Sequence, residues 1–328
     1  MSTLFSHFFT KINQISPLEH DFTEVLESIA LKPKMLYFYG KIPKNVSKNR
    51  KQGRPKTVAI VGSRHNTKYG EEVAYQLAYE LAKHGVVIIS GLAYGIDSIA
   101  HRGCLDAGGV TIAILGTPID QIYPRNHLHL AEEIIEKHGA IISEYPPRVK
   151  EYQDSPLAPG EYYSKTGKRT QDHKGSFLYR NRLIAGLSDV VVVVEAAERS
   201  GSLNTATHAL EQGKEIFAVP GNITNPYSQG CNKLIRQGAT PYTSPQDILE
   251  LFFPDEYLKK RQKLRQADLF GDTDVETLIL QSLAAGLRSG EEIMAKTHLP
   301  PEVFNEATTI LEIKSRIRSL GMNRWSLI

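Results

Sequence analysis

Five short segments of the chain combine glycine, hydroxyl, arginine and aromatic side chains in a way that suits binding to nucleic-acid phosphates and bases. Glycine lets an anion approach the backbone closely, and an arginine guanidinium can bind a phosphate through two parallel hydrogen bonds. Aromatic rings between arginines offer stacking surfaces for bases. The segments are Gly62-Ser63-Arg64, Ser90-Gly91 with Gly95, Tyr123 with Arg125, Phe177 with Arg180-Asn181-Arg182, and Ser200-Gly201-Ser202. Each segment taken alone also fits a structural loop, so their combination carries the prediction.

One pair of side chains resembles an acid–base pair. Asp97 and His101 are four residues apart, which places them on one face of a helix. General acid–base work is one interpretation. An internal hydrogen bond that fixes the preceding turn is the favoured one.

The chain lacks the motifs that usually accompany catalysis in such folds. No GxGxxG follows the first predicted strand, no GxSxG is present, and Gly167-Lys168, which resembles part of a GxxxxGK[ST] loop, lies in a polar stretch. The cysteines and histidines do not have metal-ligand spacing. We therefore predict a binding protein with no catalytic residue, no metal and no cofactor.

Short β-branched runs alternate with amphipathic segments such as Tyr69–His84. The runs are apolar on both faces, as strands buried in a parallel sheet must be. They are Val58–Gly62, Val86–Gly91, Thr111–Gly116, Ala140–Tyr145, Asp189–Ala196 and Glu215–Gly221, with a further short strand at Met35–Tyr39. Gly85, Gly139 and Gly213 suit helix C-caps. The alternation predicts an α/β fold with an extended, Rossmann-like doubly wound and mostly parallel sheet, which binds ligands at the carboxyl ends of its strands.

Four regions follow from these patterns: a helical and basic connector at 1–56, a Rossmann-like DNA-binding domain at 57–253, a linker at 254–273 and a small winged-helix-like domain at 274–328. The connector has short helices, for example around Asp21–Ala30, and nine Lys or Arg residues without an acid between Lys32 and Lys56. Glu151–Gly175 is a polar insertion. The pattern of the last region predicts three helices and a hairpin. The predicted third helix spans Pro301–Ser319 and carries Lys314, Arg316 and Arg318.

Composition places the protein inside the cell. The formal net charge is only +3, so charge alone selects no partner. Two distant cysteines, Cys104 and Cys231, fit a reducing compartment. The chain shows no signal-peptide pattern and no apolar run of about 18 residues. We predict a cytoplasmic protein without a membrane partner.

The motifs together resemble those of the DNA-processing protein A (DprA/Smf) family. They occur in the family's order over about residues 57–245. The matching segments are Val58–Arg64, Ser90–Asp97 with Ala100-His101, Tyr123-Pro124, Arg180–Ser188, Ser200–Ser202 and Phe217–Gly221. The C-terminal segment is similar to the winged-helix domain that many members carry.

The resemblance implies binding of single-stranded DNA without strong sequence preference. It also implies a homodimer, and delivery of a RecA-type recombinase onto incoming DNA during natural transformation or recombination, without catalysis. Arg64 would contact a phosphate, and Arg180 and Arg182 would flank the same positive pocket.

The sequence departs from the family pattern at four places. Pro118 stands where a second glycine is usual, Asn204 stands where isoleucine is usual, Glu151–Gly175 is longer than expected, and the N-terminal helical domain is short.

Two other functions remain open. One is a nucleotide-binding sensor or a phosphoribohydrolase-like enzyme, with Glu195 as acid and Arg64 as anchor. The other is a transcription regulator that acts through the winged helix.

Overall fold

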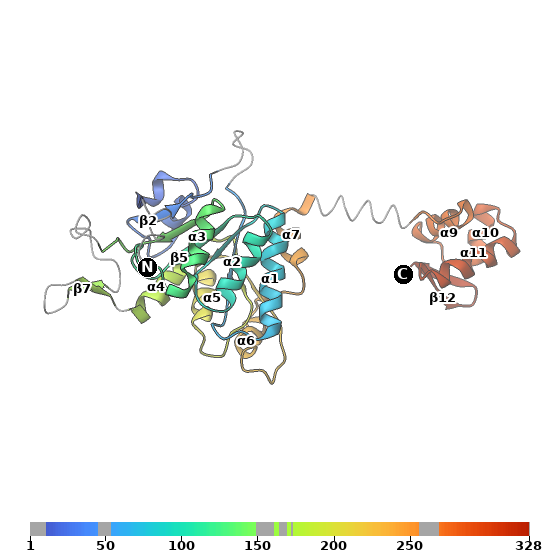
Figure 1. Cartoon of the computed structure of the whole chain (residues 1–328). Helices are drawn as coiled ribbons and strands as arrows, with labels where there is room; N and C mark the ends of the chain where they lie inside the picture. The colour runs from blue at the N-terminus through green and yellow to red at the C-terminus, as the bar shows by residue number, and fades with distance from the viewer. Residues whose placement is uncertain are drawn as a thin grey trace. The chain divides into compact units, whose positions relative to one another are not determined.

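A computed structural model describes residues 11–44, 54–148, 161–163, 169–171, 173–255 and 269–327. The chain divides into two compact units, Met1–Leu249 and Glu250–Ile328 (Figure 1). Each unit is described by itself.

The first unit is built on a nine-stranded sheet with the order β1-β2-β6-β5-β4-β3-β9-β10-β11. The strands from β6 to β11 are parallel, and β1 and β2 run antiparallel at one edge. Their bounds are β1 Asn13–Ile15, β2 Leu36–Gly40, β3 Thr57–Val61, β4 Val87–Ser90, β5 Thr111–Leu115, β6 Ala140–Ser143, β9 Val190–Val193, β10 Glu215–Ala218 and β11 Thr240–Pro241. The predicted α/β, mostly parallel sheet is confirmed.

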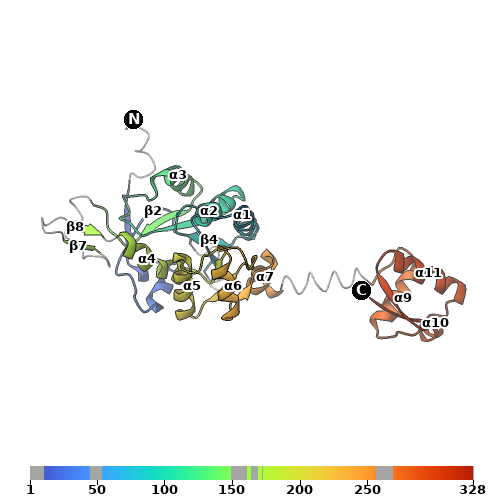
Figure 2. The same cartoon turned by 90° about the horizontal axis from the view of Figure 1, so that it is seen from below.

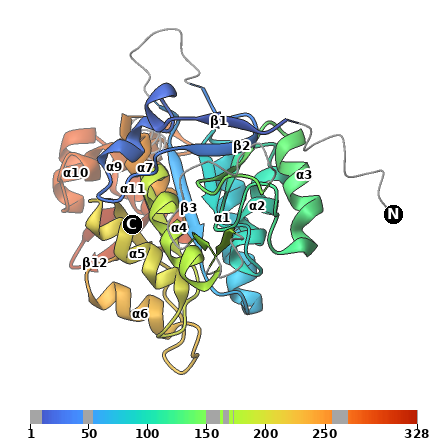
Figure 3. The ribbon, with the colours of Figure 1, turned by 90° about the vertical axis from the view of Figure 1, so that its left-hand side faces the viewer.

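Helices cover both faces of this sheet. Figures 2 and 3 show α1, α2 and α3 on one face and α4, α5 and α6 on the other. The bounds are α1 Lys68–Lys83, α2 Ile96–Asp106, α3 Leu128–Glu136, α4 His173–Leu187, α5 Gly201–Glu211, α6 Gln229–Arg236 and α7 Pro245–Phe252, with a 3-10 turn η3 at Arg125–His127. The central strands β3, β4, β5, β6 and β9 are buried at every residue, because helices shield them on both sides.

Two of the three predicted glycine C-caps are confirmed. Gly85 and Gly213 have φ of +74° and +65°, the left-handed region that glycine adopts without strain. The prediction for Gly139 is wrong, because the left-handed residue there is His138, at φ +66°. Gly139 is instead needed for space, since a Cβ at this position would collide with the Thr111 carbonyl oxygen.

The N-terminal segment extends the sheet, whereas the sequence pattern set residues 1–56 apart as a connector. Its two short helices, η1 (Pro17–Glu19) and η2 (Glu24–Ser28), are 3-10 turns between β1 and β2. Arg54 fastens the segment. Its guanidinium donates to the carbonyl oxygens of Phe22 and Leu187 and pairs with Asp189 at 3.1 Å. Burial lowers the pKa of Arg54, and Asp189 opposes this shift.

The polar insertion at Glu151–Gly175 contains an antiparallel pair of strands, β7 (Glu161–Tyr163) and β8 (Arg169–Gln171). Most of its other residues, Gly167-Lys168 included, lie outside the described ones. Among the described residues, no helix is both long enough and apolar enough to cross a membrane.

The second unit contains the three helices and the hairpin that the sequence predicts. They are α9 Asp274–Ala284, α10 Gly290–Thr297, α11 Pro301–Ile313, β12 Ile317–Gly321 and β13 Arg324–Leu327. Residues from all three helices and from β12 form a separate core, with Leu280, Ile293, Phe304 and Ile317 fully or almost fully buried.

The prediction that the third helix is basic is wrong. Helix α11 ends at Ile313, so Lys314, Arg316 and Arg318 lie beyond it. Lys314 pairs with Asp272 and Glu276, each at 2.8 Å, and Arg318 lies on β12. The exposed side chains of α11 include three carboxylates, Glu302, Glu306 and Glu312, and no cation. These exposed carboxylates of α11 repel phosphate.

Arg182 is buried and its guanidinium is neutralised by a carboxylate, so the prediction that it flanks a phosphate pocket is wrong. Its side chain, on α4, is buried in a two-pronged ion pair with Glu144, at 2.8 and 2.7 Å. Its Nε also donates to the Leu31 carbonyl oxygen at 2.7 Å, and its guanidinium lies 3.8 Å from the centre of the Tyr179 ring. Arg182 thus joins α4, the end of β6 and the N-terminal segment.

Substituting one member of this pair should destabilise the first unit. Arg182→Met leaves the Glu144 carboxylate buried without its cation, which should lower the free energy of unfolding by about 3–5 kcal/mol. The double variant Arg182→Met/Glu144→Leu should recover most of that loss, because no charge is left buried. Urea unfolding followed by circular dichroism measures both. The control is Lys68→Met, which breaks an exposed pair with Glu71 and should cost less than about 1 kcal/mol. An equal loss of stability in Arg182→Met and in Lys68→Met would contradict the assignment of Arg182 and Glu144 as a buried ion pair.

His101 is a buried imidazole on α2 that cannot readily accept a proton. Its Nδ1 lies 2.7 Å from Thr111 Oγ1, and its Nε2 has no partner among the described residues. Burial, assisted by His127 and Arg180, lowers the pKa of His101 to about 3. Between that value and the ordinary pKa of 6.5, only the unfolded chain binds the proton, so stability falls as the pH falls.

Acidification from pH 7.5 to pH 5 should therefore remove about 2 kcal/mol of stability through His101 alone. His101→Gln does not titrate, so its free energy of unfolding should decline less than that of the wild type by this amount. Urea unfolding at the two pH values gives the comparison. His84→Gln, an exposed histidine at the end of α1, should behave like the wild type. An identical pH dependence in His101→Gln and wild type would refute the argument.

Candidate nucleic-acid interface

The order of the strands opens a cleft at the carboxyl ends of the sheet. After β3 the chain moves outward through β4, β5 and β6, and then returns to place β9 on the other side of β3. Loops that leave such a switch point diverge and leave room for a ligand. A cleft of about 890 Å³ lies there. The loops after β3 and β9, the middle of α4 and the first turn of α5 line it.

The loop after β3 forms one wall of the cleft. Ser63 Oγ accepts a hydrogen bond from the His65 N–H at 3.1 Å and donates to the His65 carbonyl oxygen at 3.0 Å, which fixes the turn. Gly95, at φ +74°, packs beneath it, and a Cβ there would collide with the Ser63 carbonyl oxygen. Ser90 is buried and its Oγ donates to the Ile60 carbonyl oxygen at 2.6 Å. Gly95 and Ser90 therefore support the loop from behind.

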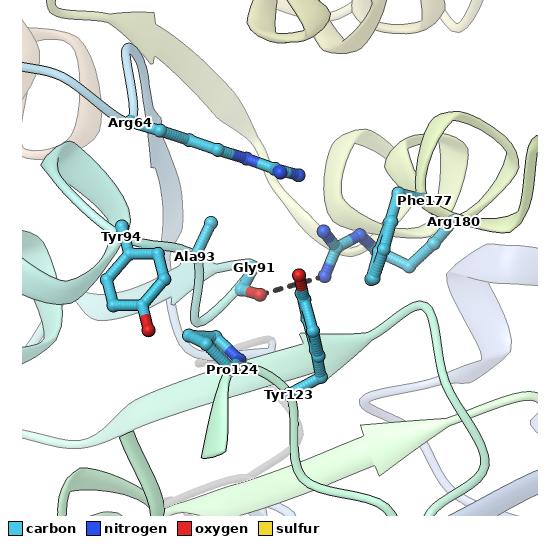
Figure 4. Close-up of a pocket in the computed structure, with 8 residues that line it drawn as sticks. All are labelled: Arg64, Gly91, Ala93, Tyr94, Tyr123, Pro124, Phe177 and Arg180. Atoms are coloured by element: carbon cyan, nitrogen blue, oxygen red, sulfur yellow. Dashed lines mark hydrogen bonds between the residues drawn. The ribbon is translucent and has the colours of Figure 1, made fainter. Parts of the chain in front are cut away.

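Arg64 is exposed on this loop and reaches over an aromatic wall. Its guanidinium lies 5.6 Å from the centre of the Phe177 ring, and the Phe177 and Tyr123 rings are 5.3 Å apart. Figure 4 shows Arg64 on one side of a small hollow, with Tyr94 and Tyr123 below it. The rings of Tyr94 and Tyr123 are about half exposed. The arrangement offers a cation and ring faces to the same ligand.

Arg180 lies at the floor of the cleft. Its exposed fraction is 4%, and its Nη1 donates to the carbonyl oxygens of Gly91, at 3.0 Å, and Ile114. Burial lowers the pKa of this guanidinium to about 10, and the nearby Asp97 carboxylate opposes that shift. Gly91 has no room for a side chain, since a Cβ would lie 2.7 Å from Arg180 Nη2. Arg180 therefore ties the ends of β4 and β5 together from below.

Asp97 completes this floor. Its Oδ2 accepts a hydrogen bond from the Gly91 N–H at 3.0 Å, which confirms the interpretation of an internal bond that fixes the turn. Burial raises the pKa of Asp97, and Arg180 opposes the shift. His101 bonds to Thr111 instead, so the two residues do not form an acid–base pair.

The start of α5 forms the opposite wall. Ser200 caps the helix by accepting a hydrogen bond from the Ser202 N–H, and the two hydroxyls are 2.7 Å apart. Arg199 is exposed just before the cap. The N–H groups of a first helical turn carry partial positive charge and favour anions. This end of the cleft therefore attracts negative charge, as the Arg64 end does.

Most of the predicted site residues meet in this cleft or in the adjoining hollow. They are Gly62, Ser63, Arg64, Gly91, Tyr123, Phe177, Arg180, Asn181, Ser200, Gly201 and Ser202. Ser90, Gly95, Arg125 and Arg182 do not line either one. Arg125 is exposed on η3, where its side chain belongs to a neighbouring surface.

The sequence-based prediction missed several lining residues, including His65, Tyr94, Leu178, Arg199, Asn204 and Tyr227. Arg199 could have been found, since it directly precedes Ser200-Gly201-Ser202. Tyr227 could not, because it comes from the distant loop before α6, and its carbonyl oxygen accepts from the Ala196 N–H at 2.7 Å.

Glu195 is unavailable as an acid for chemistry in the cleft. It is buried, and its two carboxylate oxygens accept from the Thr67 N–H at 2.8 Å and the Thr67 hydroxyl at 2.5 Å. It does not line the cleft. In the part of the chain that the structure describes, no cluster of His, Cys, Asp and Glu could hold a metal ion.

Comparison with known proteins agrees with the resemblance inferred from the motifs. The family model described as DNA recombination-mediator protein A matches residues 13–253. DNA processing protein DprA of Bacillus subtilis (strain 168) is 40% identical over 239 residues, which cover 73% of this chain and 71% of that protein. Protein Smf of Escherichia coli (strain K12) is 47% identical over 193 residues, which cover 59% of this chain but only 46% of that protein.

Two solved structures share the fold. DNA processing protein A from Streptococcus pneumoniae superposes with a TM-score of 0.58 at 36% identity, covering 74% of this chain and 75% of that one. DNA processing protein A from Helicobacter pylori, whose structure was solved to explain its single-stranded DNA binding mode, gives a TM-score of 0.58 at 30% identity and covers 76% of this chain and 99% of that one. The family match spans most of the first unit. The chain belongs to the DNA recombination-mediator protein A family, the family of the DprA and Smf proteins.

Proposed function

We propose that the chain binds single-stranded DNA in the cleft between the loop after β3, the middle of α4 and the first turn of α5. One observation carries the proposal: exposed guanidinium groups, Arg64 and Arg199, line the cleft together with the half-buried ring of Phe177 and the exposed side chain of Leu178. Cations hold the backbone, and an aromatic ring can stack on any base. Binding of this kind tolerates many sequences.

The proposed role is binding without chemistry. Two buried carboxylates beside the cleft are occupied, since Asp97 accepts from the Gly91 N–H and Glu195 accepts from Thr67. A buried carboxylate with its oxygens bonded in this way is a structural group. We therefore favour a non-enzymatic protein over the phosphoribohydrolase-like alternative.

The wider role that we propose is recombination mediation within the cell. As a homodimer, the protein would deliver single-stranded DNA to a RecA-type recombinase during DNA uptake or recombination. Support comes from the family description and from the named single-stranded DNA binding of the Helicobacter pylori relative. The acidic face of α11 weighs against the alternative of a transcription regulator that reads duplex DNA with that helix.

Arg64→Ala should weaken binding of a labelled oligo-dT by roughly 1–3 kcal/mol, since a charged hydrogen bond to phosphate is lost. The slope of log K against log salt should also become shallower by about one. Fluorescence anisotropy titrations at several salt concentrations measure both quantities.

The matched control is Arg125→Ala, an exposed arginine outside the cleft, which should bind like the wild type. Unchanged affinity in Arg64→Ala would remove the cleft as the DNA site. Release of free base from a nucleoside monophosphate by the purified protein would instead support the enzyme alternative.

Arg199 should contribute to the same binding from the opposite wall. Arg199→Ala should lower the affinity for oligo-dT by roughly fivefold, and its effect should add to that of Arg64→Ala if the two arginines contact different phosphates. The double variant tests additivity. Arg102→Ala, on the outer side of α2, is the control. If Arg199→Ala binds oligo-dT with wild-type affinity, the DNA contacts only the wall of the cleft that carries Arg64.

A further inference from the structure

Two asparagine side chains lie side by side in the cleft. Asn181 is on α4 and Asn204 is in the first turn of α5, and both line the space where the proposed function places DNA. Neither is needed to explain the attraction of phosphate. Asn181 is 8% exposed, so its amide is held in place by its surroundings.

Hydrogen bonds fix which way each amide points. Asn181 Nδ2 lies 3.2 Å from the Gly201 carbonyl oxygen, which can only accept, so the amino group of Asn181 must face it. The same Nδ2 lies 3.1 Å from Asn204 Oδ1. Asn204 therefore presents its oxygen to Asn181, and its own amino group points elsewhere. A backbone carbonyl thus orients two side chains in succession.

This orientation leaves one acceptor and one donor unused. Among the described residues, nothing bonds to Asn181 Oδ1 or to Asn204 Nδ2. Neither atom is among the polar atoms that are sealed off without a partner, and both residues line the cleft. The pair offers an acceptor beside a donor on a rigid support.

Such a pair matches the Watson–Crick edge of a base. Adenine, cytosine, guanine and thymine each carry an N–H donor next to an acceptor on that edge, and single-stranded sites in proteins commonly bond to it. In a duplex, the same atoms are occupied by the opposite strand. An amide pair that uses this edge therefore accepts any unpaired base and rejects a paired one.

We infer that Asn181 and Asn204 read the Watson–Crick edge of an unpaired base, with Asn181 Oδ1 accepting from the base and Asn204 Nδ2 donating to it. The pair selects single strands over duplex without selecting sequence. This inference rests on the proposed DNA-binding function and names the part of the DNA that the cleft recognises besides the backbone.

The test compares oligo-dT with an oligonucleotide of equal length made of N3-methylthymidine. The methyl group removes the N3–H donor and leaves the phosphates and the ring faces in place. Wild-type affinity should fall by roughly fivefold or more, the value of one ordinary hydrogen bond and of the acceptor left unpaired. Fluorescence anisotropy at one salt concentration measures the ratio of the two affinities.

The double variant Asn181→Leu/Asn204→Leu keeps the branched shape of each side chain but removes the amides. Its affinity ratio for the two oligonucleotides should approach one, while Asn305→Leu on α11 should keep the wild-type ratio. A wild-type ratio near one would overturn the inference, and this measurement needs no variant to fold. A ratio that persists in the double variant would also overturn it, because the methyl group would then be sensed elsewhere. Failure to bind oligo-dT at all would instead reject the proposed function.

Discussion

The buried guanidinium of Arg180 holds the floor of the cleft in place. Parallel strands that end at one edge of a sheet leave carbonyl oxygens without partners, and Arg180 donates to two of them, at Gly91 and Ile114. Asp97 neutralises part of its charge and takes the Gly91 N–H. The loops that carry Arg64 and Tyr123 stand above this floor, so the exposed groups can face the ligand because the buried hydrogen bonds of Arg180 and Asp97 fix the strand ends.

Three arginines that the sequence groups together serve three different purposes. Arg64 is exposed, Arg180 is a buried brace, and Arg182 is neutralised by Glu144 far along the chain. The strands, the helices and the positions of the loops were predictable, because apolar runs and glycines report on local conformation. The destination of each guanidinium was not, since it depends on residues such as Glu144 and Asp97 that no spacing rule connects to it.

The second unit illustrates the same limit. The number of helices and the hairpin follow from periodicity, and the structure confirms them. The basic character assigned to the third helix came from placing its end a few residues too late. Once α11 ends at Ile313, Lys314 turns back to Asp272 and Glu276, and the helix presents carboxylates. A boundary error of a few residues therefore changed the predicted charge of this helix surface from positive to negative.

The pairing of β2 with β6 has a practical consequence for anyone who trims the chain. Strand β6 is covered on one side by β5 and on the other by β2, which comes from the N-terminal segment. A fragment that starts at residue 57 would expose the full hydrogen-bonding edge of an apolar central strand, which invites intermolecular strand addition and precipitation. Expression boundaries should therefore begin ahead of β1.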